Sequence, residues 1–192
     1  MGVTFDDTER KFVFVFEHDG AEDIVSLTGD GYQVEAFGKC FYYGYEFSEQ
    51  VESSVRTAFI KYVKITEALQ DTPDLTNFIK KAIDNLDKKI NLYHYDLVVF
   101  PSSRSRGLQY MMRYIYRFNQ PKLRKYEEIL AQPLDEELCS IIRQQNVLVI
   151  DDVTTSGSTL NEVLRTLRIL NEENDITIFS LIGRKDLMAD SL

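Results

Sequence analysis

Residues 95–182 place the tightest limit on the fold of this chain, because short apolar runs there alternate with helical patterns. The apolar runs are YDLVVF (95–100), NVLVID (146–151) and ITIFSLI (176–182). Between them, apolar residues recur at three- and four-residue spacing over about 108–116 and over 158–170. Strands that are apolar on both faces belong to parallel sheets covered by helices. We therefore predict an α/β fold with a parallel sheet and helices on both of its faces.

Residues 1–47 follow a different pattern, which is typical of antiparallel strands. KFVFVFE alternates around three phenylalanines, and the turn signals HDG, TGDG and FGK follow it. Such short connections predict an antiparallel meander of about four strands. We expect residues 1–47 to form a β-rich N-terminal extension and residues 48–192 to form the α/β domain, which opens with helices over 48–69 and 75–90.

Composition and charge exclude several classes of protein. The net charge of −9 disfavours binding to nucleic acid or to an anionic membrane, because a like-charged surface repels phosphates. Only Cys40 and Cys139 are present, without a CxxC pair, so neither a disulfide framework nor a zinc ribbon is indicated. No secretory leader precedes the first strand, and no apolar run approaches the roughly 20 residues of a membrane span. We expect a cytoplasmic protein.

The stretch VLVIDDVTTSGSTL (147–160) places carboxylates and hydroxyls where a predicted strand ends. Residues 154–159 offer closely spaced N–H groups and hydroxyls, and Gly157 permits close approach of the backbone. They lead into a helix whose positive dipole end favours a phosphate monoester. Asp151 and Asp152 suit vicinal hydroxyls or a hard cation such as Mg²⁺. Phosphate beside a diol describes a ribose 5-phosphate.

Other phosphate motifs do not fit, since no Lys follows the glycine and GxGxxG is absent. Instead, the stretch resembles the phosphoribosyl pyrophosphate (PRPP) signature of type I phosphoribosyltransferases. The resemblance implies a Rossmann-like parallel-sheet core and catalytic carboxylates Asp151 and Asp152, which contact the ribose hydroxyls partly through Mg²⁺. It also implies a set of residues around the 5-phosphate: Thr154, Thr155, Ser156, Gly157, Ser158 and Thr159.

A second loop, PSSRSRG (101–107), follows the first strand of the predicted core, where this family keeps its pyrophosphate loop. Its candidate pyrophosphate ligands are Ser102, Ser103, Arg104 and Arg106. Small residues admit an anion, and the guanidinium groups give bidentate hydrogen bonds. Residues 102–125 hold seven Lys or Arg and no Asp or Glu. In that stretch, Arg113 and Arg117 fit a solvated helix face, while Lys122, Arg124 and Lys125 fall where the family has a mobile lid.

The resemblance covers about residues 95–185, and its wording is most similar to competence-associated phosphoribosyltransferase homologues, although their zinc-binding cysteines are missing. It implies transfer of ribose 5-phosphate from PRPP to a nitrogen acceptor, a base or an amine, with release of pyrophosphate. Thr155 stands where 6-oxopurine enzymes usually have Asp, which disfavours hypoxanthine or guanine as the acceptor.

Three alternatives stay open: a non-catalytic PRPP or nucleotide sensor, a structural protein with a degenerate motif, and an RNA-binding regulator. The aromatic N-terminal strands could act as a hood over the acceptor, as a surface for homodimer formation or as packing.

Overall fold

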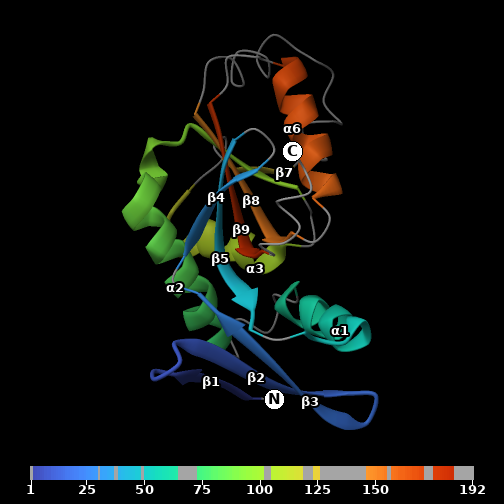
Figure 1. Ribbon diagram of the computed structural model, residues 1–192. Helices are drawn as coiled ribbons and strands as arrows, with labels where there is room; N and C mark the ends of the chain where they lie inside the picture. Colours follow the sequence, from blue (N-terminus) through green and yellow to red (C-terminus); the bar gives the residue numbers. More distant parts are fainter. Residues whose placement is uncertain are drawn as a thin grey trace.

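The computed structural model describes residues 2–29, 31–36, 39–48, 50–64, 73–101, 105–118, 123–125, 146–154, 157–170 and 175–183. Nine strands and several helices lie in these ranges (Figure 1). The strands are β1 (Gly2–Asp6), β2 (Lys11–His18), β3 (Ala21–Thr28), β4 (Tyr32–Ala36), β5 (Lys39–Phe47), β6 (Leu97–Phe100), β7 (Leu123–Lys125), β8 (Asn146–Val153) and β9 (Asp175–Ile182). The helices are α1 (Ser53–Lys64), α2 (Pro73–Ile90), α3 (Arg106–Tyr110) and α6 (Ser158–Leu170), with a 3₁₀ turn at Leu92–His94 and a π-helix at Met111–Ile115.

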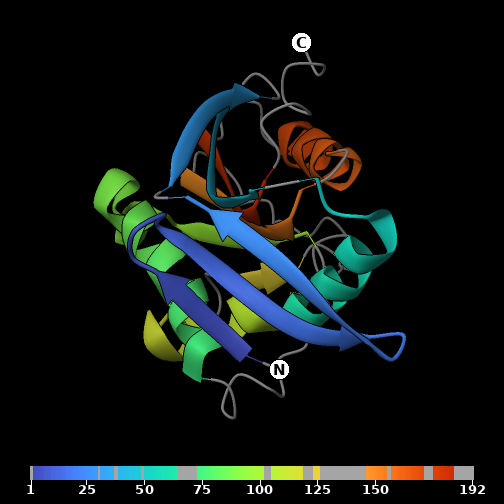
Figure 2. The same cartoon turned by 60° about the horizontal axis from the view of Figure 1, so that its bottom comes forward.

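All the described strands belong to one mixed sheet, which confirms the predicted α/β class. Its order is β1-β2-β3-β5-β9-β8-β6-β7. Strand β4 pairs with residues 39–43 of β5, on the edge that β3 contacts farther along at residues 46–47. The five strands β5, β9, β8, β6 and β7 are parallel to one another, whereas β3 and β4 pair with β5 antiparallel. Strands β1, β2 and β3 are antiparallel and cross the lower end of the molecule (Figures 1 and 2). The sheet therefore has a parallel core with an antiparallel flank.

Helices cover both faces of this sheet, as the apolar runs predict. On one face, α6 packs its apolar side on β8, β9 and β6. On the other, α1, α2 and the helix that begins at α3 bury their apolar residues against the sheet in a larger core. Rings from strand β2 fill much of that second core, since Phe14 contacts both Phe59 of α1 and Phe78 of α2 with ring centroids 4.8 and 5.1 Å apart.

The N-terminal region differs from the expected meander in two respects. Residues 2–47 contain five strands rather than about four, and the last of them, β5, pairs in parallel with β9 through Phe41↔Ile178 and Tyr43↔Ser180. Strand β5 is buried in both cores, because Phe41 and Tyr43 belong to the core under α6 and Tyr45 belongs to the core on the other face, and all three are at most 2% exposed. A strand without a polar face suits the middle of a sheet. The proposed boundary at residue 47 thus falls between strands of one continuous sheet.

Candidate functional site

Strands β6 and β8 flank the point where the order of the parallel sheet reverses. The chain runs from β6 to β7 on one side of β6, and then returns to β8 on its other side. In open α/β sheets, ligands bind in the crevice at such a switch point, outside the carboxyl ends of the strands. The loops that follow β6 and β8 are the two that the sequence singles out for binding anions. The two predicted anion loops therefore start from the carboxyl ends of adjacent parallel strands, since Pro101 follows β6 and Thr154 follows β8.

Asp151 and Asp152 are both residues of strand β8, near its carboxyl end. They are 7% and 2% exposed, and β8 continues to Val153, which pairs with Ile182. Successive side chains of a strand point to opposite faces. Val149 belongs to the core under α6, while Ile150 belongs to the core on the other face. Asp151, which lies opposite Ser180, therefore faces the α6 side, and Asp152 faces the α3 side.

Asp152 is joined directly to the loop that follows β6. The Ser105 hydroxyl donates a hydrogen bond of 3.0 Å to Asp152 Oδ2, and both side chains are at most 2% exposed. The other carboxylate oxygen, Oδ1, accepts a bond of 2.7 Å from the Val153 N–H. Ser105 occupies the N-cap of α3 but makes no side-chain capping bond. Its hydroxyl thus connects the start of α3 to strand β8. A serine at an N-cap usually bonds a backbone N–H of its own helix instead.

Four of the six residues predicted to bind a 5-phosphate are described between the end of β8 and the first turn of α6, namely Thr154, Gly157, Ser158 and Thr159. Gly157 is buried and has φ +71°, a conformation that favours glycine, and its carbonyl accepts the first bond of α6 from Asn161. Ser158 and Thr159 are exposed in the first turn of that helix. Within the described part of the chain, the buried Thr154 Oγ1 has no hydrogen-bond partner. A buried hydroxyl without a partner is costly unless a ligand or water satisfies it.

The remaining predicted site residues are only partly covered by the structure. Thr155, Ser156, Ser102, Ser103, Arg104 and the candidate lid residue Lys122 lie outside the described residues. Arg124 and Lys125, which were expected in the same mobile lid, belong instead to strand β7 and pair with β6. Arg106 is exposed at the first position of α3. Ser105 was not among the predicted pyrophosphate ligands, although it lies between Arg104 and Arg106 in the sequence. A small hydroxylated residue inside a predicted anion loop was the signal available for it.

Asp151 and Asp152 are the carboxylates that the sequence proposes for contact with Mg²⁺. Among the described residues, no group of three or more His, Cys, Asp or Glu side chains is arranged to hold a metal ion. Asp151 offers the hard oxygen that Mg²⁺ prefers, and Mg²⁺ commonly keeps water and phosphate oxygens as further ligands. The residues fit Mg²⁺ that arrives with a phosphorylated ligand.

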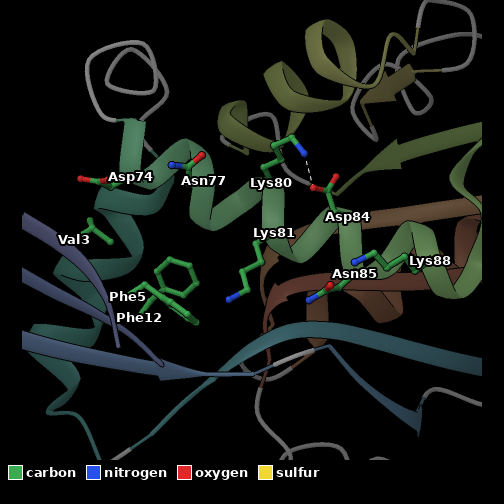
Figure 3. A pocket seen from close by; sticks show the side chains of 10 residues that line it. All are labelled: Val3, Phe5, Phe12, Asp74, Asn77, Lys80, Lys81, Asp84, Asn85 and Lys88. Atoms are coloured by element: carbon green, nitrogen blue, oxygen red, sulfur yellow. Dashed lines mark hydrogen bonds and ion pairs between the residues drawn. The ribbon is translucent and has the colours of Figure 1, made fainter. Parts of the chain in front are cut away.

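A separate groove of about 530 Å³ lies between α2 and strands β1 and β2 (Figure 3). It is lined by Val3, Phe5, Phe12, Asp74, Asn77, Lys80, Lys81, Asp84, Asn85 and Lys88. Lys81 points toward the phenylalanines, with its ammonium 3.5 Å from the centre of the Phe5 ring, and Lys80 pairs with Asp84. None of the predicted site residues in the described ranges lines this groove, so it is separate from the predicted ligand site at the ends of β6 and β8.

Comparison with known proteins does not identify a family for this chain, so a function must be proposed from its own residues. No protein-family model matches the chain, and a search of curated proteins finds no match either. In the described ranges, no helix combines the length and the apolar character needed to cross a membrane.

Proposed function

We propose that the chain binds PRPP at the switch point between β6 and β8 and acts as a phosphoribosyltransferase of the type I class. The observation that carries the proposal is that β6 and β8, the strands that lead into the two candidate loops, are parallel neighbours at the switch point. One loop leads into the helix α6, whose N-terminal dipole favours the 5-phosphate, and the other leads into α3 with Arg106 at its start. Among the residues that the structure describes, the buried Thr154 hydroxyl has no hydrogen-bond partner, which supports a ligand at this edge.

In the proposed reaction, the bond between C1 of the ribose and the pyrophosphate oxygen breaks as the acceptor nitrogen bonds to C1. The nitrogen then loses its proton. The task of the protein is to orient the donor, to stabilise the leaving pyrophosphate and to exclude water. Asp151, on the α6 side, is placed to accept hydrogen bonds from ribose hydroxyls and to favour positive charge that develops on the ring. Bound Mg²⁺ would supply charge neutralisation for the pyrophosphate.

Titration calorimetry with PRPP and Mg²⁺ tests the donor site. The wild-type chain is expected to bind, and the pair Asp151→Asn with Asp152→Asn is expected to weaken binding on the order of tenfold or more, since bonds to charged groups are lost. Asp175→Asn, which changes an exposed carboxylate at the start of β9, is the matched control. No binding by the wild type, or unchanged binding by the double variant, rejects the site.

A second candidate function is a sensor that binds PRPP without turnover. The sequence offers two candidate loops for the donor PRPP, but among the described residues no side chain is assigned to contact an acceptor. This imbalance favours the sensor. An assay of pyrophosphate release with purine, pyrimidine and amine acceptors separates the two functions. PRPP binding without release for any acceptor would favour the sensor, and release with one acceptor would establish the transferase.

A further inference from the structure

Asp151 and Asp152, although adjacent in sequence, serve different loops. The alternation along β8 puts Asp151 on the face covered by α6. It puts Asp152 on the opposite face, where its carboxylate accepts a hydrogen bond from Ser105 at the start of α3. From this we infer that Asp152 is a positioning residue, which holds the pyrophosphate loop through Ser105, whereas Asp151 is the carboxylate that meets the ribose. This inference rests on the proposed function.

The hydrogen bonds of Asp152 support this role. Oδ2 accepts from Ser105 at 3.0 Å, Oδ1 accepts from the Val153 N–H at 2.7 Å, and the side chain is 2% exposed. Both oxygens of the carboxylate are therefore engaged inside the protein. A charged hydrogen bond between fully buried groups is strong, because little water competes for it.

Ser105 is placed to transmit the effect of this carboxylate to the anion loop. It is 1% exposed and directly precedes Arg106, the first residue of α3. Removing its hydroxyl would free the end of the loop from β8 and would leave a buried carboxylate oxygen without this donor. The direction in which the Arg106 backbone enters the helix would then be less well defined. We therefore expect the affinity of the protein for pyrophosphate to fall, and its affinity for ribose 5-phosphate to stay unchanged.

The test compares two partial ligands, Mg²⁺-pyrophosphate and ribose 5-phosphate, with PRPP itself. Calorimetry is performed on the full chain with Ser105→Ala, which removes one hydroxyl. We expect weaker binding of pyrophosphate and of PRPP, on the order of tenfold, and binding of ribose 5-phosphate within about twofold of wild type. Ser180→Ala is the matched control, because this serine on β9 is also fully buried but donates its bond to Ile182 O.

Asp152→Asn gives a second measurement on the same contact. If Asp152 acts through Ser105, the changes Ser105→Ala and Asp152→Asn break one interaction. The variant that carries both changes is then expected to bind pyrophosphate no more weakly than whichever single variant binds it less tightly. Thermal unfolding of each variant shows whether it is folded. Equal weakening of ribose 5-phosphate and pyrophosphate would mean that Asp152 contacts the sugar, and unchanged pyrophosphate binding by both variants would remove the coupling. Wild-type chain that binds none of the three ligands would reject the proposed function and this role together.

Discussion

Gly44 lies in β5 at the place where this strand contacts both α2 and β9. A Cβ atom at this position would come within 2.8 Å of the Ala82 Cβ and within 2.9 Å of the Leu181 carbonyl oxygen. Real Cβ atoms do not approach other atoms so closely, and neither of these neighbours is the end of a flexible side chain. The glycine therefore sets how closely helix and sheet can pack.

Gly44→Ala is expected to lower the free energy of unfolding by about 1–3 kcal/mol, because a tightly packed core must shift to admit a methyl group. Urea denaturation followed by circular dichroism measures the change. Gly2→Ala is the control, since no atom lies within 4 Å of the corresponding Cβ, and it is expected to be neutral. Equal stability of the Gly44 variant and wild type would mean that β5 and α2 are less closely packed than the structure has them.

At the level of residues, the sequence identified the acidic pair but not its arrangement. Asp151 was placed at the last position of the predicted strand and Asp152 after it, because charged residues are seldom buried. The structure extends β8 to Val153, and the period of two then separates the carboxylates. The contact with Ser105 was beyond prediction, since it joins residues 47 positions apart.

Helix α2 is tied to the helix that follows α3 by a small polar network. Asp84 pairs with Lys80 on its own helix and accepts a hydrogen bond from the Tyr116 hydroxyl. Burial acts to raise the pKa of Asp84, but the hydrogen bonds from Lys80 and Tyr116 outweigh it and lower that pKa below its ordinary value of 3.8. The folded state therefore favours the carboxylate form of this side chain.

This network makes a stability contribution that depends on pH. A lowered folded-state pKa stabilises the protein above pH 3.8, and the contribution is lost as the pH falls below that value. Wild type is expected to lose more stability than Asp84→Asn between about pH 5 and about pH 3. Denaturation at a series of pH values provides the measurement, and Tyr116→Phe is expected to give an intermediate result. Parallel acid profiles for wild type and Asp84→Asn would show that the network has no effect.

The helices differ in how well their patterns predicted them. Helix α6 occupies Ser158–Leu170 as expected, because its apolar residues keep the helical period throughout and Gly157 marks its start. The segment expected as one helix over about 108–116 begins at Arg106 and changes to a π-helix at Met111. A bond from Tyr116 N to Met111 O replaces the usual spacing of four. Such a change depends on packing and leaves no period in the sequence.

At the scale of the whole molecule, the N-terminal strands and the α/β region depend on each other through β5. Its rings are buried in both cores, with Phe41 and Tyr43 on the α6 side and Tyr45 stacked on Phe78 of α2 at 4.3 Å. Sequence patterns did not predict the parallel pairing of β5 with β9, because short connections favour antiparallel neighbours. Partners 137 positions apart, such as Phe41 and Ile178, leave no local signal.

A fragment of residues 48–192 is expected not to fold, since it would expose the edge of β9 and would leave both cores without the rings of β5. The dispersion of its NMR amide spectrum is the measurement, compared with the full chain. Deletion of β1 is the control, because this strand is at the edge of the sheet and pairs with β2. A well-dispersed spectrum of the fragment would show that residues 48–192 form an independent domain.

The pairing of β5 with β9 also has a consequence for the order of events during synthesis. Strand β5 leaves the ribosome early, but its parallel neighbour ends at Ile182. Until β9 is made, the long apolar strand cannot take its place in the middle of the sheet. Contacts between distant segments also slow folding, because the chain must close a large loop before they form. The growing chain therefore carries β5 with its β9 edge unpaired until late in translation, which is when chaperones that recognise extended apolar segments would bind it.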